Sequence, residues 1–221
     1  VTDIINQTGT SVTFKDAEYK DDTFYAYNVQ NGVDNVVVPG SIKKFQLNVN
    51  NDNEVTLTAP ESEVTVNITN NANIKINPDQ SSNLDVVGKG TIKLNPTTED
   101  LKDNTLKVGT IQPEGDGITL ESSAPKLDIQ KIDVYPIEGT PSTSITGNAN
   151  GETTCQKLLL QGRSALTVKN IDLLNDIYIG LLSSIRLEDK TKFEKVNFHI
   201  KYNRQTPETI FPIVIKSTND G

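Results

Sequence analysis

The sequence predicts an all-β protein whose chain winds into a parallel β-solenoid, a β-helix-like stack of short strands with about 20 residues per coil and an N-terminal β cap. Three observations support this fold class. Short alternating apolar segments return about every 20 residues, helical periodicity is nearly absent, and asparagine is abundant in the polar stretches between the apolar segments. Such a period is typical of units that bury an apolar face only by stacking on their neighbours.

The period is carried by aliphatic residues, because the chain has no Trp and no Met and its aromatic content is 5%. A thin core of Val, Ile and Leu suits a narrow stack. Two series of apolar residues indicate two strands per coil. The main series is Leu47, Val64, Leu84, Leu106, Leu127, Ile145, Leu166 and Ile185, and the second is Leu57, Ile76, Leu94, Leu120, Leu158, Ile177 and Phe198.

Residues 1–40 differ from the rest of the chain. They contain strand-like runs at 11–14, 23–27 and 33–38, a charged stretch at 15–22, and a closing Pro-Gly turn. A solenoid needs an atypical element over its first apolar rung. We therefore expect this segment to be an N-terminal β cap, or a small β domain fused to the stack.

Residues 41–203 form the predicted solenoid body, and the pattern is cleanest before residue 95. Its strands of four or five residues are separated by turns rich in Pro and Asn. The alternative is an antiparallel β-sandwich, whose hairpins favour Asn-Gly or Asp-Gly turns. Those dipeptides are missing between the strands of this region, which favours the solenoid.

Two polar stretches, 113–117 and 139–154, interrupt the period. Insertions in stacked folds emerge from one face and often carry binding. The longer stretch supplies candidate binding-loop residues, although a plain loop stays the alternative: Thr140, Ser142, Thr143, Ser144, Asn148 and Asn150.

The segment 165–187 is open to two interpretations. Ile171, Leu174, Tyr178, Leu181 and Ile185 follow a helical spacing, but the same stretch contains alternating apolar pairs. Asn-Asp, Gly and Ser-Ser pairs would weaken a helix and serve well as turns. We predict strands.

Residues 204–221 form a tail that contains an apolar terminal strand. Pro212 removes a backbone donor, so an edge or end position is expected. The strand either closes the stack or pairs with another subunit. The candidate assembly residues are Ile210, Phe211, Ile213, Val214 and Ile215.

Charge and composition narrow the partners and the compartment. A net charge of −8, spread along the chain, argues against nucleic acid, and no apolar run is long enough to span a bilayer. The chain starts at Val1 without an apolar leader, and its Asn- and Thr-rich, Met-free composition is typical of an exported mature protein. Secretion or cell-surface display is the expected localisation.

The usual catalytic constellations are missing. His199 is the only histidine and Cys155 is the only cysteine, which excludes a common zinc site. Cys155 adjoins the loop-like stretch 151–154, so we expect it to lie in a loop as an inert thiol. Turn carboxylates at 51–54, at 99–103 and at 114–116 have the oxygen chemistry of a Ca²⁺ site, but lack EF-hand spacing. We predict no cofactor and no enzymatic activity.

The period over residues 42–203 resembles that of the parallel β-helix proteins, a group that includes polysaccharide lyases, phage tailspikes and bacterial surface adhesins. No family motif matches, so no functional residue carries over. The sequence favours a non-enzymatic structural or adhesive protein that self-associates into fibres or binds another surface protein. The alternative is a carbohydrate-binding or polysaccharide-degrading β-helix protein with a glycan partner.

Overall fold

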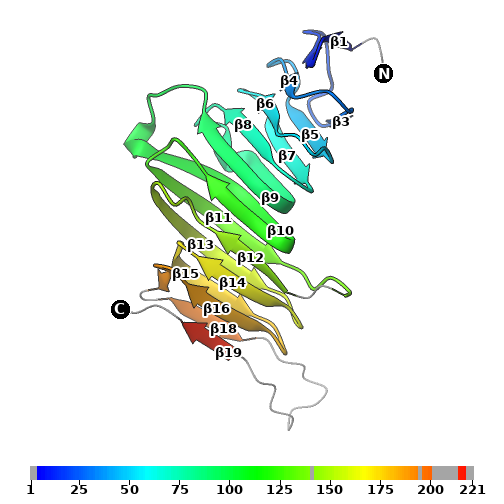
Figure 1. The fold of residues 1–221 in the computed structure, drawn as a ribbon. Helices are drawn as coiled ribbons and strands as arrows, with labels where there is room; N and C mark the ends of the chain where they lie inside the picture. Colours follow the sequence, from blue (N-terminus) through cyan, green and yellow to red (C-terminus); the bar gives the residue numbers. More distant parts are fainter. Residues whose placement is uncertain (1–3, 140–141, 194–195, 201–213, 218–221) are drawn as a thin grey trace.

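The computed structural model winds the chain into a parallel β-solenoid of about nine turns with about 20 residues per turn (Figure 1). It describes residues 4–139, 142–193, 196–200 and 214–217. Every strand pairing among them is parallel except that of β1 (Ile5–Thr8) with β2 (Ser11–Phe14). The solenoid prediction is confirmed, and the antiparallel sandwich is excluded.

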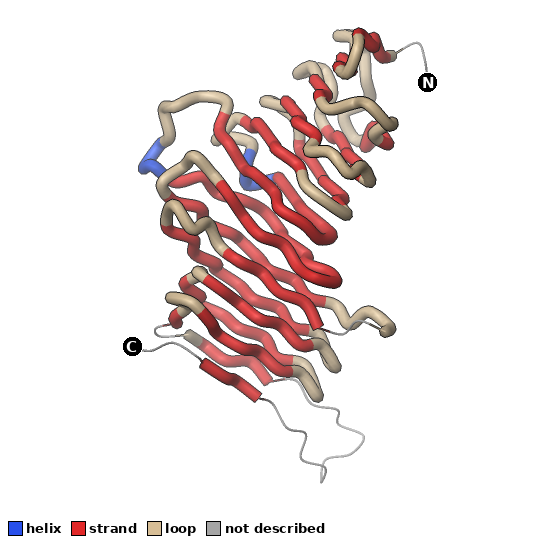
Figure 2. The backbone as a smooth tube through the Cα atoms, viewed as in Figure 1, coloured by secondary structure: helices blue, strands red, loops and turns tan. Residues whose placement is uncertain are grey.

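Two stacks of strands face each other across the interior, and loops join them at the strand ends (Figure 2). Stack A contains β2, β4 (Asn35–Val37), β6 (Val55–Thr58), β8 (Ala72–Ile76), β12 (Ser142–Thr146), β14 (Ala165–Lys169), β16 (Ser184–Glu188) and β19 (Val214–Ser217). Stack B contains β3 (Phe24–Asn28), β5 (Lys44–Val49), β7 (Glu63–Ile68), β11 (Lys126–Val134), β13 (Glu152–Leu160), β15 (Asp172–Ile179), β17 (Lys192–Phe193) and β18 (Asn197–Ile200).

Two long strands, β9 (Leu84–Pro96) and β10 (Thr105–Glu121), run through the bend and belong to both stacks. The short 3₁₀ turns η1 (Ser81–Asn83) and η2 (Lys102–Asn104) precede them. Gly88 and Gly90 allow β9 to bend, because both have positive φ and a Cβ would lie within 1.8 Å of the carbonyl oxygens of Ile68 and Asn70.

The core consists of aliphatic columns that run along the stack. In β5 and β7, inward-facing residues are buried and their neighbours are half-buried, as strand alternation requires. The long column of stack B joins all its coils through paired positions: Tyr27, Leu47, Val66, Val86, Ile111, Ile132, Leu158, Ile177 and Phe198. Each fully buried member contributes about 1.5–3 kcal/mol of burial free energy.

Outward-facing asparagines add a second kind of column at the N-terminal half of stack B. The Nδ2 of Asn48 donates to the Oδ1 of Asn28 (2.7 Å), and the Nδ2 of Asn67 donates to the Oδ1 of Asn48 (2.8 Å). Stacked side-chain amides of this kind hold consecutive coils in register. The asparagine abundance of the sequence is therefore used within strands as well as in turns.

The segment 165–187 forms β14, β15 and β16, so the prediction of strands is confirmed. Asn175, which the helical alternative would have placed inside a helix, has a φ of 58° within β15. Such a left-handed backbone is compatible with asparagine and incompatible with a regular helix.

The main apolar series predicted from the sequence, Leu47 to Ile185, had the right period, but its members belong to two different stacks. Leu106 pairs with Leu127 in stack B, whereas Ile145, Leu166 and Ile185 belong to stack A. The polar segment 139–154 was expected to be a loop, and residues 142–146 of it form β12, while 152–154 begin β13. The hydroxyl-rich strand lacks the apolar alternation by which strands were recognised.

Residues 1–40 supply β1 and three strands that continue the body, since β3 pairs with β5 and β4 with β6. The 113–117 stretch lies within β10: Pro113 pairs with Gly88 and Ile118 with Gly90, so β10 carries extra residues there. The division into 1–40, 41–203 and 204–221 stays a prediction, and 204–213 and 218–221 lie outside the described residues.

Candidate functional site

The N-terminal end of the stack is closed by aromatic side chains. Phe14 packs edge-to-face against Tyr27 (ring centroids 5.9 Å apart) and Phe45 (5.2 Å), and all three are buried. The antiparallel strand β1 covers the outer edge of β2. Stack A therefore ends in a hairpin that presents polar side chains to solvent.

The loop before β3 covers the same end over stack B. Tyr19 packs edge-to-face on Tyr25 (5.0 Å) and donates its hydroxyl to the carbonyl oxygen of Lys15 (2.7 Å). The hydroxyl of Tyr25 accepts from the backbone N–H of Lys20 (2.9 Å). These contacts fold the charged 15–22 stretch against the first coil.

The C-terminal end differs, because its core columns end in exposed apolar side chains. Leu173, Ile177 and Ile179 are each 1% exposed. Their partners one coil further along are Phe193, Phe198 and Ile200, which are 37%, 39% and 57% exposed. We call these three residues the C-terminal apolar rung.

His199 lies on the outer face of β18, as its alternation with apolar neighbours predicted. Its ring stacks on Tyr178 (4.2 Å, 10° between planes), and its Nε2 lies 2.9 Å from the Oδ1 of Asp176. The ammonium group of Lys157 lies 5.0 Å from the centroid of the same Tyr178 ring. The imidazole is thus held by two surface neighbours.

The predicted assembly strand is described only in part. The backbones of Val214 and Ile215 pair with Ser184 and Ile185 of β16 in the same chain. Ile210, Phe211 and Ile213 lie outside the described residues. A role of this segment between subunits stays a prediction.

A polar groove of about 460 Å³ lies over the outer face of stack B, between the turn that precedes β9 and strand β15. Its lining comes from five consecutive coils. The residues are Pro78, Asp79, Ser82, Lys102, Asp103, Thr105, Lys107, Lys126, Asp128, Thr154, Gln156 and Leu174. We call it the Asp128 groove.

The floor of the Asp128 groove is a hydrogen-bonded network that joins three strands. Asp128 is 9% exposed, and its Oδ1 accepts from the Oγ1 of Thr154 (2.8 Å) and the Nε2 of Gln156 (2.8 Å). Its Oδ2 lies 3.4 Å from the Nε2 of Gln130. Gln156 in turn accepts from the Nδ2 of Asn175. This connected network fixes the floor before any ligand arrives.

The rim of the groove carries charges that lack ion-pair partners. Within the part of the chain that the structure describes, no carboxylate lies within ion-pair distance of Lys102, Lys107 or Lys126. The same holds for the carboxylates of Asp79 and Asp103 with respect to cations. The rim therefore presents free donors and free acceptors side by side.

Sequence reasoning singled out only Asp103 of this groove, as a candidate Ca²⁺ ligand. The register explains the omission: Lys107 pairs with Asp128, and Asp128 with Thr154, across coils that are longer than 20 residues. A search at the average period does not align these positions. Polar residues at the local register spacing were the signal that could have found them.

The candidate binding-loop residues are dispersed. Thr140 lies outside the described residues, whereas Ser142, Thr143 and Ser144 lie in β12. Ser142 and Thr143 line a separate cavity of about 370 Å³ over β12, β14 and β16.

The remaining two binding-loop candidates lie in the turn after β12. Asn148 is buried and donates its Nδ2 to the carbonyl oxygen of Ser122 (3.1 Å), while Asn150 is exposed. Asn148 therefore fixes a turn, and whether the other residues bind a partner stays a prediction.

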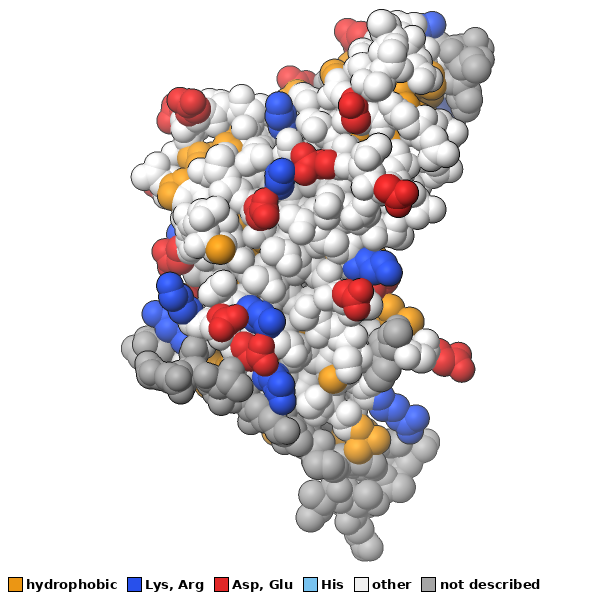
Figure 3. Space-filling model, viewed as in Figure 1, with side chains coloured by type: hydrophobic (Ala, Val, Ile, Leu, Met, Phe, Trp, Pro, Cys, Tyr) orange, Lys and Arg blue, Asp and Glu red, His pale blue; other side chains and the backbone are white. Residues whose placement is uncertain are grey.

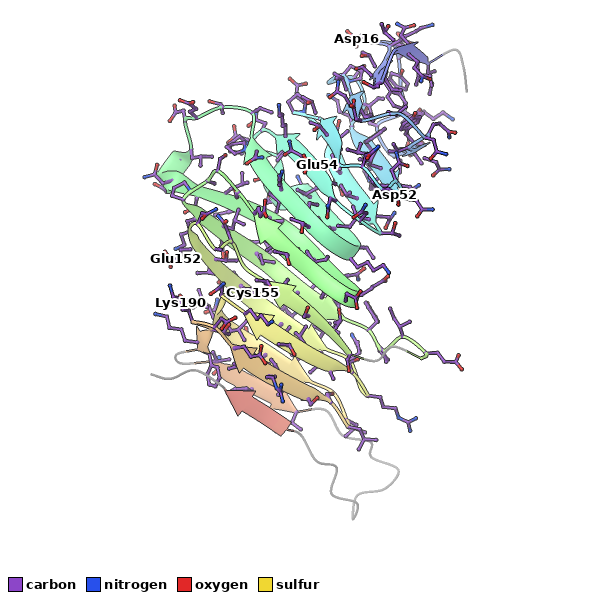
Figure 4. The ribbon with its side chains drawn as sticks, in the orientation of Figure 1. Asp16, Asp52, Glu54, Glu152, Cys155 and Lys190 are labelled. Atoms are coloured by element: carbon purple, nitrogen blue, oxygen red, sulfur yellow. The ribbon has the colours of Figure 1, made fainter. Side chains whose placement is uncertain are left out.

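Cys155 lies in β13, with its side chain in the core between Ile129 and Leu173, rather than in a loop (Figure 4). It is 1% exposed. Burial raises the pKa of the thiol to about 12, so the nucleophilic thiolate is not populated at neutral pH.

The candidate calcium turns are separated in space. Among the residues that the structure describes, no three His, Cys, Asp or Glu side chains gather into a metal-binding group. Glu54 is engaged by Lys93 at 2.9 Å, and Asp103 lines the Asp128 groove. The described residues also include no helix long and apolar enough to cross a membrane.

Comparisons of the chain with protein-family models, with curated proteins and with solved structures found no match. The C-terminal apolar rung and the Asp128 groove are the two surface features on which a function can rest.

Proposed function

We propose that the protein is an exported, non-enzymatic structural or adhesive component that acts through its long β faces and through subunit contacts. The observation that carries the proposal is the C-terminal apolar rung. Phe193, Phe198 and Ile200 continue core columns whose other members are buried, yet they are exposed. An exposed apolar cluster at a strand edge marks an association site.

A second copy of the same end is the partner that fits this geometry. The N-terminal end is less suited to this contact, because β1 occupies the edge of β2 in stack A and Tyr19 of the 15–23 loop packs on Tyr25 of β3. A twofold axis perpendicular to the stack would place β18 against β18 of the partner copy in antiparallel pairing. Twofold dimers are the commonest oligomers, and this one closes on itself instead of growing into a fibre.

The two side chains best suited to catalysis support a non-enzymatic role. Cys155 is buried with a raised pKa, and His199 is engaged by Tyr178 and Asp176 on an open surface. Figure 3 shows a face on which charges of both signs are scattered without a large patch of one sign. Such a surface suits contact over an extended area.

Light scattering coupled to size exclusion, on the full chain over a range of concentrations, tests the proposal. We expect a dimer for the natural sequence and a folded monomer for Phe198→Ser/Ile200→Ser. Phe24→Ser is the matched control, because Phe24 is equally exposed (42%) but lies at the N-terminal end. A natural chain that stays monomeric, or a control that also dissociates, contradicts the proposal.

A further inference from the structure

The geometry of the Asp128 groove points to a second function: binding of an uncharged polysaccharide chain laid along the solenoid axis. The groove lies on the outer face of stack B and ends at Leu174 of β15, whereas the C-terminal apolar rung belongs to the strands of the next coil. This inference is therefore independent of the dimer proposed above.

The ligand class follows from the chemistry of the rim. Ammonium groups only donate hydrogen bonds and carboxylates only accept them, whereas each sugar hydroxyl does both. The rim presents three lysines and two aspartates, and the buried Asp128 adds a third carboxylate in the floor; the rim residues are Lys102, Lys107, Lys126, Asp79 and Asp103. Balanced charges disfavour a strongly anionic or cationic chain, and vicinal hydroxyls match alternating donors and acceptors.

The orientation follows from the spacing of the coils. The lining residues come from five consecutive coils, so the groove extends over four strand spacings, about 19 Å. One hexopyranose unit is comparable in length to one strand spacing. A linear chain along the axis therefore advances about one coil with each sugar, and the lining side chains change from coil to coil, as from Lys107 to Asp128 to Thr154.

The floor favours binding because it is already ordered. Gln156 is fixed by Asp128 on one side and by Asn175 on the other, so its position costs little entropy on binding. Among the residues that the structure describes, none that lines the groove is aromatic, so these residues offer no stacking platform. Hydrogen bonds alone then set the affinity, and we expect dissociation constants of about 1 mM.

The test is a titration of the full chain, followed by NMR, with neutral hexasaccharides of glucose, mannose, galactose, xylose and N-acetylglucosamine, and with a hexagalacturonate. We expect at least one neutral probe to shift the side-chain amide resonances of Gln156 and Asn175. Lys107→Ala/Asp103→Ala should weaken that binding about tenfold. Lys75→Ala/Asp116→Ala is the matched control, since both residues are exposed and lie outside the groove.

Three results would overturn the inference. One is the absence of binding by every neutral probe up to about 10 mM. Another is tighter binding of the hexagalacturonate than of any neutral probe. The third is binding that the groove variant and the control variant weaken equally, since that places the sugar elsewhere.

Discussion

The two ends of the solenoid terminate the apolar core in different ways. At the N-terminal end, Phe14, Tyr27 and Phe45 fill the first two coils and β1 covers the edge of stack A. At the C-terminal end, Phe193 and Phe198 also pack edge-to-face (5.5 Å), but they stay exposed. Aromatic residues thus terminate the core at both ends, and among the described residues those of the N-terminal end are buried whereas those of the C-terminal end are exposed. The difference supports a stabilising role for the first end and agrees with the association that we propose for the second.

Replacing a phenylalanine by alanine at each end should give the largest difference in unfolding free energy between the two ends. Equivalent ends would instead give equal losses. Phe45→Ala empties a fully buried site and should lower the free energy of unfolding by about 3–5 kcal/mol. Phe198→Ala removes an exposed ring and should cost less than about 1 kcal/mol in the monomer. Urea unfolding at a protein concentration below the dimer midpoint measures both. Equal losses would show that the C-terminal rung is packed as tightly as the first two coils.

Alkaline pH should weaken the C-terminal half through Cys155. The folded-state pKa of its thiol, about 12, lies above the ordinary value of an unfolded cysteine. At a pH below that ordinary value, the full contribution of the thiol to the free energy of unfolding is present. This contribution is lost as the pH rises from the unfolded pKa toward 12, and the loss is about 2 kcal/mol near pH 10. Urea midpoints from neutral to alkaline pH should fall more steeply for the natural chain than for Cys155→Val. Identical slopes would contradict the burial of the thiol.

Thiol labelling should report which end opens first. Cys155 lies two coils from the last rung of stack B, and Val64 lies two coils from its first strand. With the C-terminal end unsealed, Cys155 should react with a thiol reagent about tenfold faster than Val64→Cys in a Cys155→Val background, a difference of about 1.4 kcal/mol in opening. Faster labelling at position 64 would reverse the proposed order of opening.

The smallest expected effect concerns the outward face of the N-terminal half. Asn48→Ala removes the hydrogen bonds to Asn28 and from Asn67, and should cost about 1–2 kcal/mol. His199→Ala, at the outward face of the last coil, should cost less than about 1 kcal/mol because its contacts are exposed. Thermal unfolding of the two variants compares them. A larger loss for His199→Ala would mean that the C-terminal surface is the better ordered one.

The sequence predicted the fold because burial along the stack repeats the same residue class at Leu47, Val66 and Val86. It did not predict β12, since Ser142 to Ser144 are polar and carry no alternation, although the parallel register recruits them. Cys155 was placed in a loop for the same reason. The Asp128 groove was missed because coil length near it departs from the average, and only the actual register brings Lys107, Asp128 and Thr154 together.

The long column from Tyr27 to Phe198 also shows that the length of the solenoid is set by its number of coils. Each coil contributes one member to the column and about 4.8 Å to the length, and it contacts mainly its two neighbours. Duplicating one coil, such as residues 44–62, should lengthen the solenoid by one strand spacing, about 4.8 Å, and leave both ends chemically unchanged. The distance between the groove and the N-terminal end is thus set by the number of coils between them, so it can change in whole coil steps without redesign of either surface.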